Sequence, residues 1–228
     1  MREIVFDTET TGLSFPGGDR MVEIGCVELF NRVETGRVFH AYFNPRRPMP
    51  AEAQAVHGLS DAFLADKPDF HTGVDELLEF LGDSPLIAHN ASFDFGFLNG
   101  ELGLCKRPKI AIGRMVDTLL IARSRHPGAK HSLDALCARF GVDRSRRVLH
   151  GALLDAQLLS QVYVELMGGR QIGLGLATSA PQVETTILVA TPKVRPPRVF
   201  AASDEELAAH AAFLETVKQP LWLAGAAG

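Results

Sequence analysis

A short strand, predicted from Glu3 to Asp7, leads into the run Phe6-Asp7-Thr8-Glu9-Thr10-Thr11-Gly12. Side chains two apart on a strand point to the same face, so the carboxylates of Asp7 and Glu9 can reach one site. Gly12 then allows the chain to turn closely past whatever lies there. Taken alone, the run is equally compatible with an ordinary polar turn.

The second motif follows another predicted strand, the apolar segment 85–89, and contains one acidic residue. It is Asp94, in the run His89-Asn90-Ala91-Ser92-Phe93-Asp94. Ser92 can cap a helix that begins here. The junction between a strand end and a helix start is a common position for a site in α/β folds. By itself, an Asp at a helix start is most often a cap.

The third motif is His150-Gly151-Ala152-Leu153-Leu154-Asp155. Residues five apart are separated by about 500° around a helix, so His150 and Asp155 would not share a helical face. Gly151 resolves this if His150 lies in a mobile loop and Asp155 lies one turn inside the helix. A mobile imidazole suits a general base, and a rigid carboxylate suits a metal ligand. A lone His before a helix is otherwise an ordinary loop residue.

Together the motifs predict a metal site. Clustered carboxylates repel one another unless a cation neutralises them, and hard oxygen ligands suit Mg²⁺ or Mn²⁺. Two ions ~4 Å apart would be bridged by Asp7 and completed by Glu9, Asp94 and Asp155. One ion would carry an attacking water and the other would stabilise the leaving oxygen, while His150 takes the proton. The order of the pieces along the chain favours this hypothesis over five unrelated polar residues.

Composition is that of an ordinary globular protein. The chain has 228 residues, of which 46% are hydrophobic and 22% charged. Its net charge of −4 argues against nucleic-acid binding through bulk positive charge. The three cysteines (Cys26, Cys105 and Cys137) have no CxxC spacing and fit reduced, buried thiols. Neither a signal peptide nor a membrane span is indicated, so a cytoplasmic location is expected.

The pattern of hydrophobic residues predicts an α/β domain. Strands are expected at 3–7, 22–26 and 37–43, and their short connections favour an antiparallel meander. Helices, including one at 116–123, then alternate with one further strand, and the most regular helix is at 152–167. We therefore expect a mixed sheet, with the meander and parallel strands, flanked by helices.

The chain changes character after Met167. Residues 169–202 are predicted to form a flexible linker after a domain at 1–168. Ser203-Asp204-Glu205-Glu206 is a capping box that opens a short helix. An apolar end with Trp222 follows, so residues 203–228 are expected to dock on a partner.

At its three motifs the chain resembles the DEDDh 3′–5′ exonucleases, which have a ribonuclease-H-like fold. The resemblance covers about residues 1–168 and is strongest to the epsilon group, the proofreading subunits of bacterial DNA polymerase III, which also have a segment like Val56-His57-Gly58-Leu59. It implies hydrolysis of DNA from its 3′ end, with release of 5′-monophosphates. The implied roles are metal binding by Asp7, Glu9, Asp94 and Asp155, general-base catalysis by His150, and contact with the terminal nucleotide by Glu52 and His57 together with Asp7, Glu9 and Asp155.

The same resemblance implies two protein partners. The run Gln171-Ile172-Gly173-Leu174-Gly175-Leu176 is similar to a sliding-clamp-binding peptide, in which Gln171, Leu174 and Leu176 would make the contacts. A plain Gly/Leu linker is an equally good interpretation. Residues 203–228 would correspond to the segment that binds the polymerase alpha subunit.

Two rival functions remain open at this point. One is a stand-alone DEDDh exonuclease that acts on RNA or on DNA in repair. The other is an inactive scaffold for a polymerase or clamp. Four arginines before His150 could guide a phosphate backbone or form a solvated basic face, and none is singled out: Arg139, Arg144, Arg146 and Arg147.

Overall fold

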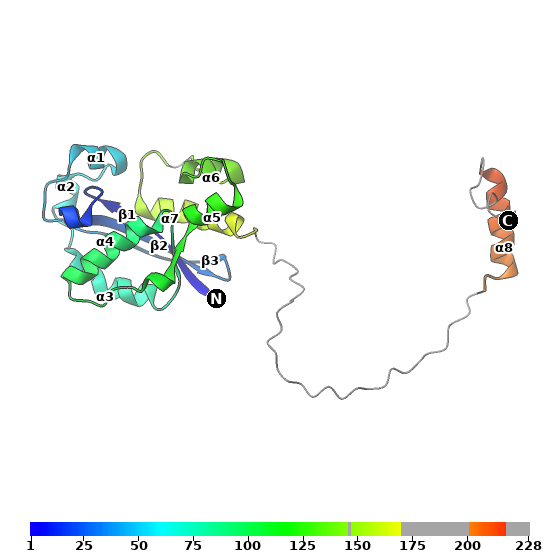
Figure 1. Cartoon of the computed structure of the whole chain (residues 1–228), viewed down its shortest axis with the longest axis horizontal. Helices are drawn as coiled ribbons and strands as arrows, with labels where there is room; N and C mark the ends of the chain where they lie inside the picture. The colour runs from blue at the N-terminus through cyan, green and yellow to red at the C-terminus, as the bar shows by residue number, and fades with distance from the viewer. Residues whose placement is uncertain (146, 170–200, 218–228) are drawn as a thin grey trace, which may run out of the picture. The chain divides into compact units, whose positions relative to one another are not determined.

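A computed structural model describes residues 1–145, 147–169 and 201–217 (Figure 1). Contacts divide the chain into two units, Met1–Leu176 and Ala177–Gly228. The first unit contains a five-stranded sheet in the order β3-β2-β1-β4-β5. Its strands are β1 (Arg2–Thr10), β2 (Met21–Phe30), β3 (Val33–Tyr42), β4 (Leu86–Ala88) and β5 (Met115–Asp117).

The sheet is mixed, as predicted. β1, β2 and β3 form the antiparallel meander, and β4 and β5 add on the other side of β1 as parallel strands. The helices of this unit are α1 (Ala51–His57), α2 (Asp61–Leu64), α3 (Phe70–Leu81), α4 (Ala91–Leu104), α5 (Thr118–Arg125), α6 (Leu133–Phe140) and α7 (Ala152–Leu166), with 3-10 turns η1 (Phe15–Gly17) and η2 (Ile112–Arg114).

Helices cover both faces of the sheet (Figure 1). Alternate residues of β1 separate the two layers. Ile4 and Phe6 pack in the cluster that contains α3 and α4. Val5 packs in the cluster that contains α7. Since Asp7 and Glu9 continue the alternation of Val5, the strand directs both carboxylates toward the α7 side.

Gly25 of β2 allows α7 to approach the sheet beside Asp7. It is the residue paired with Asp7 across the β1–β2 ladder. A Cβ atom at Gly25 would lie 2.2 Å from the backbone nitrogen of Leu153 and 2.4 Å from the carbonyl carbon of Ala152. The first turn of α7, which carries Asp155, is therefore packed directly on backbone.

Four local expectations need correction. The helix expected from Val116 begins at Thr118, because residues 115–117 form β5. Ser92 does not cap α4: the N-cap residue is Asn90, in the left-handed region with φ 64°, and its side chain makes no cap hydrogen bond. Helices α1 and α2 were not anticipated. Of the three thiols, Cys26 and Cys137 are buried but Cys105 is only partly so.

The second unit contributes one described helix, α8 (Asp204–Thr216). The Ser203 hydroxyl accepts from the Glu206 backbone and the Glu206 side chain accepts from Ser203, so the predicted capping box is confirmed. The peptide 171–176, most of the expected linker and the Trp222 segment lie outside the described residues. Over the part of the chain that is described, no helix combines the length and the apolar character needed to cross a bilayer.

The close contact between Gly25 and α7 predicts that a larger residue at this position destabilises the fold. Gly25→Ala should force the first turn of α7 away from β2, lowering stability by about 1–3 kcal/mol and displacing Asp155. Thermal unfolding and a nuclease assay on a short single strand measure both effects. Gly96→Ala is the matched control, because nothing lies within 4 Å of a Cβ at that position of α4. An unchanged melting temperature for Gly25→Ala would contradict the packing described.

Candidate active site

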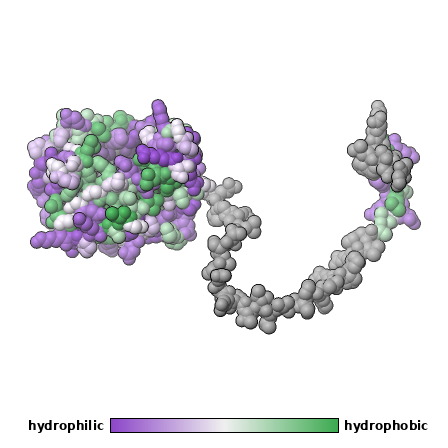
Figure 2. All heavy atoms as spheres, viewed as in Figure 1, coloured by the Kyte–Doolittle hydropathy of each residue, from purple (hydrophilic) through white to green (hydrophobic). Residues whose placement is uncertain are grey.

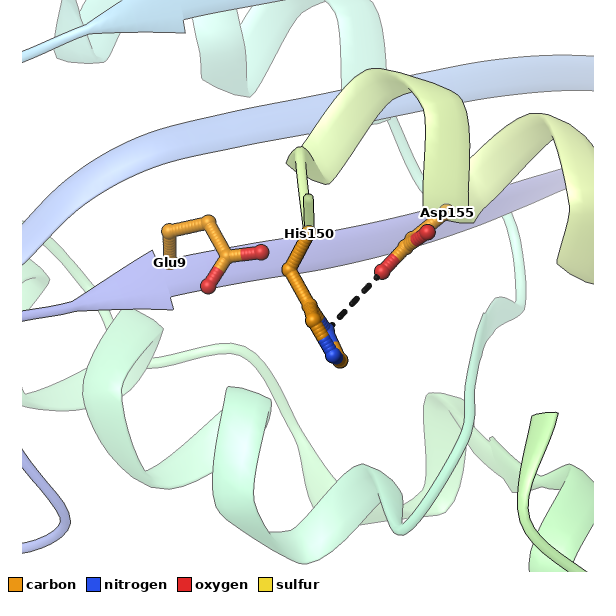
Figure 3. Close-up of side chains that lie close together, drawn as sticks. All are labelled: Glu9, His150 and Asp155. Atoms are coloured by element: carbon orange, nitrogen blue, oxygen red, sulfur yellow. Dashed lines mark ion pairs between the residues drawn. The ribbon is translucent and has the colours of Figure 1, made fainter. Parts of the chain in front are cut away.

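Three side chains from separate segments meet at the end of β1 (Figure 3). Glu9 comes from β1, Asp155 from the first turn of α7, and His150 from the loop that precedes α7. Each offers one potential ligand atom, and these three atoms lie within 4.8 Å of one another. Asp155 is 3% exposed and Glu9 8%, whereas the side chain of His150 is 49% exposed. Two buried carboxylates thus face an imidazole open to solvent.

Asp7 and Asp94 lie beside this group but are not members of it. Asp94 approaches from the α4 side, where the hydroxyl of Thr8 donates to its Oδ1 (2.7 Å). Burial and then the charge of Asp94 raise the pKa of Asp7 well above its ordinary value, with Glu9 and Asp155 adding to the effect. The four carboxylates predicted from the sequence therefore form one electrostatically coupled cluster.

The cluster makes full ionisation unfavourable. Burial, followed by the charges of Glu23, Asp155 and Asp94, raises the pKa of Glu9 from 4.5 to about 8. Burial likewise raises the pKa of Asp94 from 3.8 to about 7, although the hydrogen bond from Thr8 opposes the shift. Such shifts mark carboxylates that lack a sufficient positive charge nearby.

The turn before α4, the helix that carries Asp94, is hydrogen-bonded to β5, a strand that was not predicted from the sequence. Asp117, the last residue of β5, accepts from the backbone nitrogen of Asn90 (3.1 Å) and from that of Leu119 (2.8 Å). The hydroxyl of Thr118 donates to the carbonyl of Ala88 (3.1 Å). These bonds secure the unusual backbone of Asn90, and with it the start of α4.

Arg147 is a residue of the site that the sequence did not distinguish from its neighbours. Its Nε donates to Asp155 Oδ1 (2.5 Å) and its Nη2 donates to Asp155 Oδ2 (2.7 Å). Nη2 also lies 2.9 Å from His150 Nδ1. The side chain of Arg147 is 9% exposed. A single sequence does not show which of four neighbouring arginines contacts the site. Only the three-dimensional structure identifies Arg147.

Glu23 is a fifth carboxylate near the site. It lies directly opposite Glu9 in the β1–β2 ladder, is 3% exposed, and contacts His40 Nε2 at 2.7 Å. Glu23 is buried although it alternates with Val22 and Ile24, because both faces of β2 are covered in this part of the sheet.

The two residues predicted to contact a nucleotide differ in their surroundings. Glu52 is exposed on the first turn of α1. His57 is 6% exposed, its Nδ1 accepts from the backbone of Leu59 (3.0 Å), and its Nε2 is the one buried side-chain nitrogen or oxygen without a partner among the described residues. Burial lowers the pKa of His57, an effect partly opposed by the nearby backbone of Thr10. The backbone of His150 donates to the carbonyl of Val56 (3.2 Å), which joins α1 to the site.

A cavity of about 780 Å³ lies along α4, bordered by the loop after β1. Its lining includes Phe93 and Phe97, which contact each other with ring centroids 4.9 Å apart. Both belong to the core that packs on the sheet, with Phe97 fully buried and Phe93 partly so. Hydrophobic patches lie among hydrophilic residues on the surface of this unit (Figure 2).

Sequence comparisons place the chain among known exonucleases. The family model described as Exonuclease (RNase_T) matches residues 4–163. A DNA polymerase III subunit epsilon from Rickettsia conorii is 51% identical over 222 residues, which cover 95% of this chain and 96% of that protein. The subunit of the same name from Escherichia coli K12 is 45% identical over 229 residues, covering 96% and 94%.

Solved structures give a consistent result for the fold. Exonuclease X in complex with 5′ overhanging duplex DNA superposes with a TM-score of 0.56 at 27% identity, covering 72% of this chain and 90% of that chain. The nuclease domain of 3′hExo, a DEDDh family member bound to rAMP, has a TM-score of 0.63 at 16% identity, covering 73% and 91%. The predicted ribonuclease-H-like architecture is confirmed.

The raised carboxylate pKa values predict the pH dependence of stability without metal. In the unfolded chain Glu9 ionises near 4.5, whereas in the folded chain it keeps its proton to about pH 8. The unfolded state therefore binds fewer protons in this window, and stability falls as pH rises through it, by an amount on the order of a few kcal/mol. Chemical denaturation in EDTA at several pH values measures the slope. Glu9→Gln should flatten it; a parent protein whose stability rises between pH 5 and 8 would refute the assignment.

Proposed function

Because this chain belongs to the exonuclease family, we propose that its clustered carboxylates hold the divalent metal ions with which it removes nucleotides from the 3′ end of DNA. The chain is a 3′–5′ exonuclease of the proofreading type, with relatives that are DNA polymerase III epsilon subunits over nearly their whole length. The proposal for the site rests above all on the approach of Glu9, His150 and Asp155 to within 4.8 Å of one another.

The donor set fits a hard divalent cation. Exonucleases of this family depend on divalent metal. Here the acidic side chains supply only oxygen atoms, and their mutual repulsion is what a bound cation would relieve. We assign Asp7, Glu9, Asp94 and Asp155 as the residues that would hold two Mg²⁺ or Mn²⁺ ions. Bound ions of this kind stabilise negative charge that develops on the phosphoryl oxygens.

His150 is assigned as the general base. Its ring is half exposed, so it can take a proton from an attacking water and pass it to solvent. Nδ1 lies 3.3 Å from Asp155 Oδ2, which stabilises the imidazolium that forms (Figure 3). The backbone bond to Val56 limits how far the loop can carry the ring from the site.

His57 and Glu52 are assigned to the terminal nucleotide. An unpartnered buried polar atom costs about 1–3 kcal/mol, so a ligand group that pairs with His57 Nε2 gains that energy on binding. Glu52 is exposed on the first turn of the same short helix, and its assignment rests on the family resemblance. Asp7, Glu9 and Asp155 would meet the scissile phosphate through the ions.

A polymerase complex is the setting in which the chain acts, given the assembly named for its relatives. We propose that residues 203–228 bind the polymerase alpha subunit. α8 is a capped helix on which no described residue is buried, and Leu207 and Phe213 are 55% and 59% exposed. A helix that leaves large apolar side chains uncovered fits a partner groove. Residues 171–176 remain a proposed clamp-binding peptide.

Substitutions can test separately the role of His150 as the base and that of Asp7 as a metal ligand. His150→Ala should lower the hydrolysis rate by about 10²–10⁴-fold while binding of Mn²⁺ stays nearly intact. Asp7→Ala should abolish both activity and tight metal binding. Single-turnover hydrolysis of a short single strand and calorimetric titration with Mn²⁺ measure the two effects. Full activity in either variant would exclude the role given to that residue.

The partner helix makes a prediction of its own. Phe213→Glu should weaken association with the polymerase by at least about tenfold, because a charge replaces a buried apolar contact. Hydrolysis of a short single strand should not change. Leu120→Glu is the control, since Leu120 is equally exposed, at 58%, but lies on α5. Co-purification that survives Phe213→Glu would remove α8 from the interface.

A further inference from the structure

We propose that Arg147 is an internal cation of the active site, which holds Asp155 and His150 in the metal-free protein and leaves Asp155 when a divalent ion binds. The inference rests on the metal site proposed above and adds a positioning residue to it. Three sets of contacts carry it: those to Asp155, those to His150, and those to Asp134.

The contact with Asp155 occupies the carboxylate edge that would face a metal. Nε and Nη2 donate to the two different oxygens at 2.5 and 2.7 Å, so the pair is a bidentate fork. Arg147 is 9% and Asp155 3% exposed, and a buried carboxylate of this kind is stable only with a charged partner. A guanidinium and a metal ion cannot both lie against the same edge.

The contact with His150 places the guanidinium against the ring of the proposed base. Arg147 Nη2 lies 2.9 Å from Nδ1 and 3.4 Å from Nε2. A single atom this close to both ring nitrogens lies over the ring face and not along one lone pair. The guanidinium thus contacts both a proposed metal ligand and the proposed base.

The charge of Arg147 also acts on the rest of the acidic cluster. It opposes the rise in the pKa of Glu9, and the charge of Asp7 in turn helps to raise the pKa of Arg147, after the larger effect of the hydrogen bond to Asp155. Arg147 therefore supplies positive charge to the acidic cluster.

Asp134 offers Arg147 a second partner at the edge of the site. Nη1 donates to Asp134 Oδ1 at 2.9 Å, and Asp134, on α6, is 46% exposed. Arg144 binds the same oxygen at 2.9 Å. When Asp155 binds a metal ion, Arg147 can stay paired with Asp134 near the solvent. Its charge is then not left unpaired in the interior.

The test is a titration of the full chain with Mn²⁺ alone, without nucleic acid, and thermal unfolding in EDTA. Arg147→Gln removes the competing cation, so Mn²⁺ should bind about tenfold more tightly while the metal-free variant melts at a lower temperature. Arg144→Gln is the matched control, because Arg144 pairs with the same Asp134 oxygen from a half-exposed position; its Mn²⁺ affinity should stay within about twofold.

Equal or weaker Mn²⁺ binding by Arg147→Gln would overturn the proposal, since a residue that only positions Asp155 should favour metal binding. If that variant does not fold in EDTA, Arg147→Lys is titrated in its place. Lysine keeps the charge but loses the fork, so tighter binding than in the parent is again required. A failure of the metal site itself is distinguishable, because the parent protein would then not bind Mn²⁺ at all.

Discussion

Like charges forced together at the end of β1 are the constraint on which the site depends. Asp7, Glu9, Asp94 and Asp155 come from three elements on both sides of the sheet, and each raises the free energy of ionising another. Carboxylates in such a place are stable only when protonated or paired with a cation. The rest of the fold has to hold them close against this repulsion, and the exonuclease chemistry requires that it does so.

Two packing features provide that restraint. Gly25 brings the backbone of α7 onto β2 beside Asp7, so that a rigid helix delivers Asp155. On the opposite side, Asp117 and Thr118 fasten the turn before α4, and Thr8 binds Asp94 directly. Neither feature touches a substrate. Both fix the positions of charged groups through contacts within the fold.

Local patterns were sufficient for residues whose role follows from strand or helix period. Alternation on β1 placed Asp7 and Glu9 on one face, and the stripe along α7 placed Asp155. β5 was missed because three residues are too few to show a period, and Asn90 was missed as the N-cap because its left-handed backbone is imposed by Asp117. Glu23 and Arg147 depend on tertiary neighbours, so no pattern within one sequence distinguishes them from surface charges.

Arg147 connects stability to metal affinity. A site with no internal cation would bind divalent ions tightly but would have to fold around bare negative charge. A site with a permanent guanidinium would fold readily but would exclude the ions. The fork to Asp155, with Asp134 as an adjacent alternative partner, lies between these limits. Asp155 is paired within the fold, and the guanidinium remains displaceable because Asp134 can keep it paired. Metal binding has to break the ion pair between Arg147 and Asp155, and this cost lowers the apparent affinity for metal. The strength of that ion pair therefore sets the metal concentration at which the protein acts.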